Sequence, residues 1–203
     1  MTDSDRIASL WLATLGELAT LASHEIRNPL NGALLNTAVV RQRAAKDAIS
    51  PAEIAPFAES AATELERVTA LIEALLALAR PVSTRVDIWM TAEQLTTLLD
   101  AVASKNGGSV VCHRAGNGPA ICPLTSELVR ALLSAGMLRA LGPANSGKVR
   151  CEVHCDASAI RVTLATASGE SIEWEPGLRA IAEREGIALV AARGETEIVF
   201  STT

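Results

Sequence analysis

The sequence is poor in aromatic side chains and contains no tyrosine. Aromatic residues make up 2% of its 203 residues, whereas hydrophobic residues make up 49%. Any hydrophobic core must therefore be filled mainly by alanine, leucine, valine and isoleucine. The length suffices for one large domain or for two small ones.

Clusters of basic residues and long apolar runs are lacking as well. The formal net charge is −5 and no Lys/Arg cluster stands out, which argues against a nucleic acid or an anionic membrane as partner. No apolar run approaches the roughly 18–20 residues that span a bilayer. The N-terminal residues do not form a basic leader followed by an apolar stretch. We therefore expect a cytoplasmic protein that makes no contact with a membrane.

Cysteine is scarce and confined to the second half of the chain. Without an export signal, Cys112, Cys122, Cys151 and Cys155 are best interpreted as reduced core thiols. The grouping of Cys151, His154 and Cys155 could suggest zinc. In a strand, however, the two cysteines would lie on one face and the histidine on the other, so we expect no metal site.

The first half of the chain has the periodicity of long helices. Residues 5–47 are predicted to form one helix, in which Pro29 should bend the helix just after His24 rather than end it. Apolar residues at three-four spacing line one face of this helix. They are Trp11, Leu15, Leu18, Ala22, Ile26, Pro29, Ala33, Thr37 and Val40.

A second helix should run from Pro51 to about Ala79. Ser50 is a suitable N-cap, and Arg80-Pro81 would stop the helix. A coiled-coil-like seam is formed by Leu65, Val68, Ile72, Leu75 and Ala79. A single hairpin cannot bury two apolar seams by itself. We therefore expect a homodimer in which two hairpins form a four-helix bundle.

The residue pattern of the sequence changes at about residue 81. We divide the chain into a helical-hairpin domain, 1–80, and a second domain, 81–203, that mixes helices and strands. Helices are expected at 91–103, 125–141 and 176–185, and strands at 109–112, 148–155, 159–165, 187–191 and 195–201. This order indicates an α/β sandwich with one helical layer on a mostly antiparallel sheet, and an α+β fold class for the whole chain.

Residues 142–148, Gly-Pro-Ala-Asn-Ser-Gly-Lys, fit the first seven positions of a P-loop. The eighth position is Val149, which lacks the hydroxyl group that would bind magnesium. The segment also joins a helix to a strand, whereas a P-loop leads from a strand to a helix. We interpret it as a simple turn.

The segment around His24 concentrates reactive side chains on one helix. On an ideal helix His24 lies about 160° from Ile26 on the apolar stripe, so it should point to solvent. Asn28 lies one turn further on the same side, and Glu25 lies about 100° away, at the edge of this face. An imidazole is a nucleophile near neutral pH. A neighbouring carboxylate can orient it, and an amide can position a water molecule or a phosphoryl oxygen.

These residues resemble a known family. The sequence His24-Glu-Ile-Arg-Asn-Pro-Leu30 resembles the H-box of two-component sensor histidine kinases, and residues 64–80 are similar to the second helix of their dimerisation and phosphoacceptor domain. The resemblance covers roughly residues 10–80. It implies that His24 is the phosphoacceptor and Glu25 its acid/base neighbour. It also implies that Glu25 and Asn28 correspond to the motif used to dephosphorylate response regulators.

The second domain resembles the ATP-binding domain of that family only in the order of its elements. The helix at 128–141 lacks the metal-binding asparagine of the family, since residues 132–140 read LLSAGMLRA. The Asp-x-Gly-x-Gly adenine loop is replaced by residues 165–171, ATASGES, and only Pro-Gly-Leu at 176–178 remains of the glycine-rich lid. A nucleoside triphosphate needs a carboxylate for the base, an oxygen ligand for magnesium and backbone donors for phosphates. We therefore expect neither ATP nor a resident metal ion.

The leading hypothesis is a histidine phosphotransferase, similar to bacterial phosphorelay transferases built as dimers of degenerate kinases. His24 would carry a phosphoryl group between the aspartates of response-regulator receiver domains, and the receiver would supply Mg²⁺. Arg27 and Asn31, together with Asn28, should dock the receiver. A hybrid histidine kinase is a further candidate partner.

Three alternatives remain open. The first is a receiver phosphatase in which Glu25 and Asn28 orient water without a stable phosphohistidine. The second is a catalytically silent protein that binds and sequesters a receiver or a kinase. The third is an autokinase with a divergent nucleotide pocket.

Overall fold

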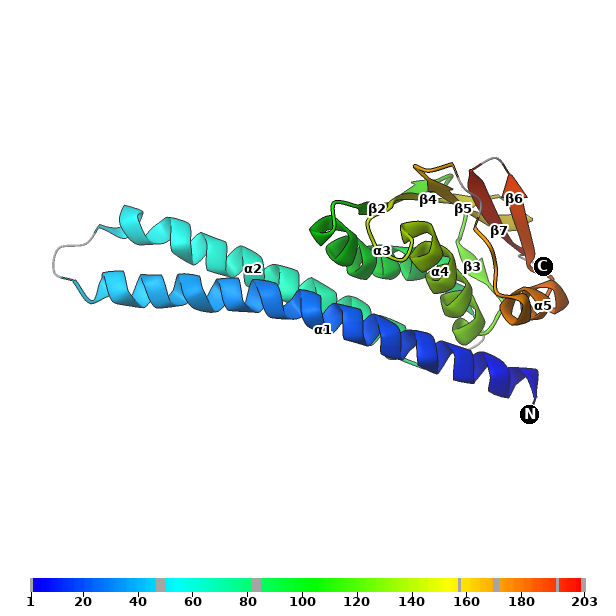
Figure 1. Ribbon diagram of the computed structural model, residues 1–203, viewed down its shortest axis with the longest axis horizontal. Coiled ribbons are helices and arrows are strands. Elements are labelled where there is room, and N and C mark those ends of the chain that lie inside the picture. The colour runs from blue at the N-terminus through cyan, green and yellow to red at the C-terminus, as the bar shows by residue number, and fades with distance from the viewer. Residues whose placement is uncertain are drawn as a thin grey trace.

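The structure is a computed structural model that describes residues 2–46, 50–81, 85–156, 158–169, 172–192 and 194–201. It consists of a long helical hairpin and an α/β domain that lies against one end of the hairpin (Figure 1). The expected α+β fold class is thus confirmed. The tip of the hairpin projects away from the α/β domain, whereas the N-terminal part of the first helix runs alongside it.

The hairpin is formed by α1 (Asp3–Ala44) and α2 (Pro51–Ala79). Both helices begin with local caps. The backbone N–H of Thr2 donates to Asp5 Oδ2 at 2.8 Å, and that of Ser50 donates to Glu53 Oε2 at 3.0 Å. The α1 helix continues through Pro29, as the sequence predicts, and α2 continues through Pro56.

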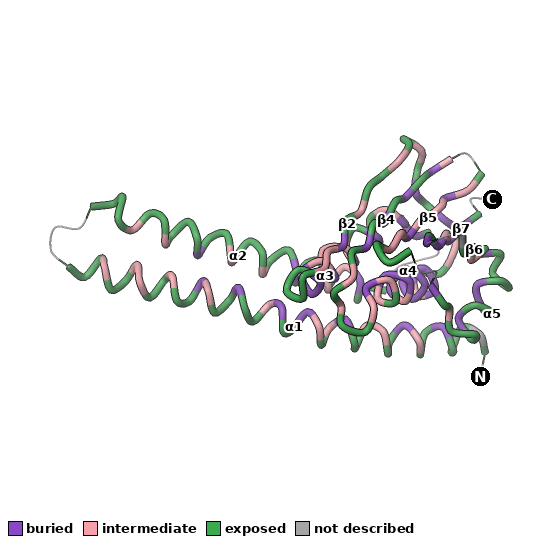
Figure 2. Tube along the Cα trace, turned by 45° about the horizontal axis from the view of Figure 1, so that its top comes forward, coloured by how far each residue is buried: buried purple, intermediate pink, exposed green. Residues whose placement is uncertain are grey.

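Burial along the hairpin is uneven. Buried residues gather toward the end that contacts the α/β domain, and the tip is mostly exposed (Figure 2). Several large apolar side chains of the hairpin remain uncovered in the single chain: Leu30, Leu34, Leu35, Leu65, Ile72 and Leu76. The hairpin therefore carries apolar surface that its own α/β domain does not bury.

The α/β domain contains α3 (Ile88–Lys105), α4 (Ser126–Leu141) and α5 (Pro176–Arg184). Its five-stranded sheet has the order β2-β4-β5-β7-β6. The bounds are β2 (Ser109–Ala115), β4 (Lys148–Cys155), β5 (Ala159–Thr166), β6 (Ala188–Ala192) and β7 (Glu195–Ser201). Only the β2–β4 pair is parallel among the described ladders of this sheet, which confirms the mostly antiparallel arrangement.

The core of the α/β domain lies between the sheet and its helices. Side chains of β4 alternate strictly, so that Val149, Cys151, Val153 and Cys155 are buried and the residues between them are exposed. His154 is thus on the opposite face from both cysteines, as the spacing argument predicts. All four cysteines are free.

The element predictions hold with small shifts at the ends. Helix α3 starts three residues earlier than expected and ends two later, and β2 extends to Ala115. The P-loop-like segment is a turn from α4 to β4, in which Asn145 adopts a positive φ of 49°. No sequence pattern predicted β1 (Val86–Asp87) and β3 (Ile121–Cys122), which pair with each other. They are two residues long and exist only because two distant segments meet. No helix in the described part of the chain is long and apolar enough to cross a membrane.

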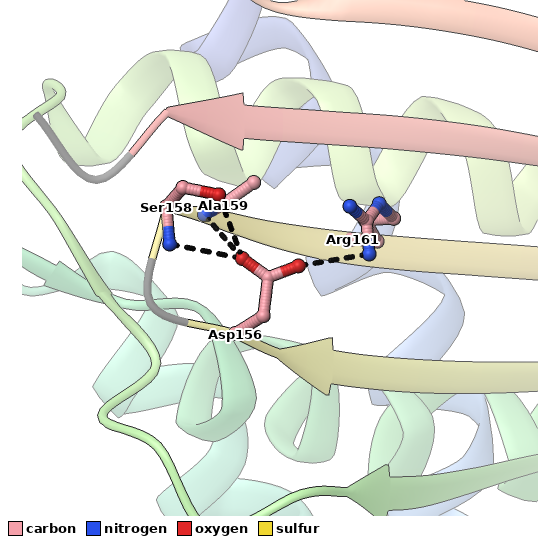
Figure 3. A network of polar contacts seen from close by, with 4 residues as sticks. All are labelled: Asp156, Ser158, Ala159 and Arg161. Atoms are coloured by element: carbon pink, nitrogen blue, oxygen red, sulfur yellow. Dashed lines mark hydrogen bonds and ion pairs between the residues drawn. The ribbon is translucent and has the colours of Figure 1, made fainter.

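The turn between β4 and β5 is held by one carboxylate. Asp156 accepts hydrogen bonds from the backbone N–H groups of Ser158 and Ala159 at 2.9 and 2.8 Å and pairs with Arg161 at 2.9 Å (Figure 3). Ala157, which the sequence also places in this turn, lies outside the described residues. These contacts, led by the bond from the Ser158 N–H, lower the pKa of Asp156 from 3.8 to about 2.

This depressed pKa predicts a pH-dependent contribution to stability. A carboxylate with a lowered folded-state pKa stabilises the fold fully above its unfolded value, and the effect fades as the pH falls through the folded value. Asp156→Asn should therefore lower the unfolding temperature at pH 6, and its difference from wild type should shrink between about pH 4 and pH 2. Thermal unfolding followed by circular dichroism across this range measures the difference. A difference that does not vary with pH would contradict the assignment.

A buried arginine joins the α/β domain to the hairpin. Arg130 of α4 is 5% exposed, and it donates to the carbonyl oxygens of Arg80 and Ala77 at 2.8 and 3.2 Å. These carbonyls belong to the C-terminal end of α2, where a helix leaves its last acceptors without intrahelical donors. The guanidinium also lies 5.8 Å from the ring centre of Trp11 in α1. One side chain thus ties both hairpin helices to α4.

Arg130→Met should lower the free energy of unfolding by about 2–4 kcal/mol, because it removes two charge-assisted hydrogen bonds and leaves helix-end carbonyls buried without donors. For a chain of this size that loss corresponds to a drop of roughly 5–10 °C in the unfolding temperature. Arg179→Met is the matched control. Its exposed ion pair with Glu183 should contribute about 0–1 kcal/mol. Equal melting temperatures for the two variants would refute the role of Arg130.

Candidate functional site

His24 lies on the open side of α1. Its side chain is exposed, together with those of Ser23, Arg27, Asn28 and Asn31. Within the described ranges no hydrogen bond or ion pair engages the imidazole. The expected exposure of His24 is therefore confirmed, and an incoming molecule can approach this ring without displacing a protein contact.

The position of Glu25 differs from the expectation. Glu25 was expected at the edge of the solvent face, but it is 6% exposed and lies on the buried stripe of α1. Leu18, Ala22, Glu25 and Pro29 follow one another at spacings of four, three and four residues, and all are buried. Ile26, which the helical spacing predicted to lie on this stripe, is only half-buried. The side chain of Glu25 thus faces α3.

Glu25 is covered by the end of α3. Lys105 in the last turn of that helix places its Nζ 3.3 Å from Glu25 Oε1. A cation at a helix C-terminus also interacts favourably with the helix dipole. Because the two residues are 80 positions apart, no local pattern of the sequence could have indicated this pair.

Pro29 changes the backbone beside the site. It has no N–H group, so the carbonyl oxygen of Glu25, one turn earlier, lacks its usual helical donor. Pro29 itself is buried, and the helix is not interrupted. Helix α1 therefore lacks one backbone hydrogen bond directly next to His24, while packing of the buried Pro29 keeps the helix continuous.

A pocket of about 390 Å³ lies next to this part of α1, and three helices contribute to it. Glu25 and Asn28 come from α1, Arg67 comes from α2, and Lys105 comes from α3. Pro29, Glu64 and Ser104 complete the lining. The structure thus brings Glu25 and Asn28 to one pocket and adds Arg67 and Lys105, both missed from sequence. Arg27 and Asn31 are exposed and do not line it.

A larger pocket of about 810 Å³ lies between the N-terminal part of α1, the end of α4 and the turn that follows it. Glu17 and Glu173 are its acidic residues, and Arg139 is its basic residue. Arg139 donates to the carbonyl oxygen of Glu173 across the pocket. Leu138 occupies the α4 surface that lines it, and hydroxyl groups come from Thr166 at the end of β5 and from Ser168 after it. Among the described residues, no three His, Cys, Asp or Glu side chains gather as for a metal ion.

Residues 14–83 match the family of the His Kinase A (phospho-acceptor) domain. This segment contains His24, both helices of the hairpin near the site, and the whole of the proposed motif. The hairpin is therefore histidine-kinase-like. The match covers less than half of the chain and ends before β1, so the α/β domain lies outside it. No curated protein matches the sequence.

Solved structures of histidine kinases are similar to this chain at low identity. Histidine kinase ThkA in complex with response regulator protein TrrA is 15% identical, with a TM-score of 0.49, and the match covers 95% of this chain and 63% of that one. The blue-light activated histidine kinase EL346 of Erythrobacter litoralis is 16% identical, with a TM-score of 0.47 and coverages of 68% and 54%. AdeS of Acinetobacter baumannii is 12% identical, with a TM-score of 0.46 and coverages of 89% and 98%. The chain thus spans less than two thirds of the first two structures.

Proposed function

We propose that this protein is a histidine phosphotransferase of a two-component phosphorelay. In the proposed step a nitrogen of the His24 imidazole attacks the phosphorus of an aspartyl phosphate on a receiver domain. The P–N bond forms as the P–O bond to the aspartate breaks, and the aspartate leaves as a carboxylate. Attack by a second receiver's aspartate reverses the step and completes the transfer.

The observation that carries this proposal is the unobstructed exposure of His24 within the segment that matches a phospho-acceptor family. An exposed histidine alone would not distinguish this role from that of an ordinary surface residue. The family match supplies the chemistry, and the free approach to the ring supplies the geometry that a protein-sized phosphoryl donor needs.

In this proposal the receiver docks on the exposed side of α1. Arg27, Asn28 and Asn31 lie on this side with His24 and offer a cation and two amides to a receiver's acidic pocket. Glu25 keeps its proposed acid/base role, which it would exert from the buried side of α1, where it lines the 390 Å³ pocket together with Asn28. The receiver supplies the Mg²⁺ that shields the phosphoryl oxygens.

We also propose that the phosphoryl group does not come from ATP bound to this chain. The charged side chains that line the 810 Å³ pocket are two carboxylates and one guanidinium, a balance that disfavours the phosphates of a nucleoside triphosphate. Glu17 and Glu173 would repel the phosphates, and Arg139 already bonds a backbone carbonyl. Leu138 offers no oxygen ligand for magnesium. The chain therefore depends on a phosphoryl group that a partner already carries.

The test is to mix the purified protein with a receiver that carries a radiolabelled aspartyl phosphate. We expect the label to move to this chain and to show the acid lability and base stability of a phosphoramidate. Incubation with labelled ATP alone is the control, and no labelling is expected. Labelling from ATP alone would instead support the autokinase, and retained receiver binding without any transfer would support the silent binder.

A phosphatase is the second candidate, because Glu25 and Asn28 line one pocket. A water molecule held there would meet a carboxylate and an amide together. In that case phosphate would be released from the receiver without a labelled intermediate. Asn28→Ala would abolish this release, whereas His24→Ala would preserve it.

A further inference from the structure

The carboxylate of Glu25 has an unusual environment for a residue beside a reactive, exposed histidine. Its side chain is 8% exposed, and a buried carboxylate is strongly destabilising unless a counter-charge and hydrogen bonds compensate for the lost hydration. In the part of the chain that the structure describes, the cation that meets it is Lys105, at 3.3 Å. Lys105 is itself half-exposed. The carboxylate of the pair is therefore shielded from solvent, whereas the amine remains accessible to it.

We infer that Lys105 is a positioning residue for Glu25. The α/β domain would thus contribute a side chain to the function of the His24 site. This inference rests on the proposed function. The amine holds the Glu25 carboxylate in one orientation on the inner side of α1, in the residue that directly follows His24. Without Lys105 the carboxylate would turn toward water and lose this orientation.

The end of α3 is rigid enough for such a role. Leu95, Leu98, Leu99 and Ala103 bury the helix in the domain core. After the helix, Gly108 donates its backbone N–H to the Ala103 carbonyl oxygen at 2.9 Å. A Cβ at Gly108 would lie 2.5 Å from the Gly147 carbonyl oxygen, so the following loop is tightly packed as well. Lys105 therefore starts from a fixed backbone.

The Arg130 contacts hold the hairpin and the α/β domain in the relative position that the Lys105–Glu25 pair needs. Arg130 fixes the C-terminal end of α2 to α4, while Lys105 meets α1 at the other end of the domain contact. A catalytic domain that must move to deliver ATP could not keep such a pair closed throughout its cycle. In a chain that receives its phosphoryl group from a partner, a permanently docked domain can support the site instead.

The experiment compares Lys105→Met, Lys105→Arg, Glu25→Gln and the Lys105→Met/Glu25→Gln double variant in transfer from a labelled receiver. Lys105→Met should lower the maximal transfer rate by about tenfold to a hundredfold, with an unchanged half-saturating receiver concentration. Lys105→Arg, which keeps the charge, should retain most of the rate. The double variant should be no slower than Glu25→Gln, because Lys105 acts only through Glu25. Lys148→Met, an exposed lysine on β4, is the matched control and should behave as wild type.

Three outcomes would overturn the inference. They are an unchanged rate in Lys105→Met, an equal loss on the wild-type and Glu25→Gln backgrounds, and a change in half-saturation alone, which would place Lys105 at the receiver. Thermal unfolding tests the pair without any transfer. Lys105→Met and Glu25→Gln should each lower the unfolding temperature by a few degrees and the double variant by no more than either, whereas additive losses would refute the pair. If wild type takes no label, the proposed function fails and the inference fails with it.

Discussion

Replacing His24 with glutamine should remove the transfer of label from a phosphorylated receiver to this chain, by more than about a thousandfold. Glutamine keeps a polar side chain of similar length but has no nitrogen that can form a P–N bond. Because His24 is exposed and the described structure gives its ring no partner, the substitution should leave the unfolding temperature unchanged. Loss of labelling in a protein of normal stability would thus be a chemical effect.

The chain offers a clean control for this experiment. His113 and His154 are its other histidines, and both are exposed on strands of the sheet. His113→Gln and His154→Gln should label as fast as wild type. Label that survives in His24→Gln and disappears in either control variant would exclude His24 as the phosphoacceptor. Receiver dephosphorylation that persists in His24→Gln without labelling would favour the phosphatase.

We expect the chain to form a dimer, and two glutamates on the exposed apolar face of α2 should convert that dimer into monomers. Leu65 and Ile72 are 48% and 40% exposed in the single chain and lie two turns apart on one face of the helix. If two hairpins form the expected four-helix bundle, Leu65→Glu/Ile72→Glu places two negative charges at the interface from each chain. The twofold symmetry of the dimer then brings the charges of both chains into the same interface. Burying each unpaired charge costs several kcal/mol, so the dissociation constant should rise by more than about a hundredfold.

Light scattering at micromolar concentration measures this change directly. Wild type should have twice the chain mass of 21.2 kDa, and the double variant should have the mass of one chain. Met90→Glu is the matched control, because Met90 is 45% exposed but lies on α3, outside the hairpin. A wild-type protein that is monomeric at these concentrations would refute the bundle. So would a double variant that remains dimeric.

The helices and strands could be predicted to within a few residues because their signals are local. Apolar spacing of three and four residues marks α1 and α2, and strict alternation marks β4, whose bounds agree with the prediction. Ser50 and Pro51 mark the start of α2 in the same way. The pair of two-residue strands, β1 and β3, had no such signal. Neither strand is long enough to show a period, and each exists only through the other.

The residues of the candidate site likewise differ in whether a local sequence pattern could predict their environment. The outward orientation of His24 and Asn28 follows from helical geometry once the apolar stripe is identified. The environment of Glu25 does not, because on an isolated helix the residue next to His24 lies at the edge of the stripe. Docking of the α/β domain extends the buried stripe across Glu25 and delivers Lys105 from a helix 80 residues away.

Local sequence patterns predict the helical hairpin, the succession of the longer helices and strands along the chain and the exposure of the candidate phosphoacceptor, because each depends on periodicities within one or two turns or strands. Contacts between distant segments determine which neighbour of His24 is buried, which cation contacts that neighbour and where the pockets lie. These features arise from packing two domains against each other, and the free energy of that packing is distributed over residues that are distant in the chain.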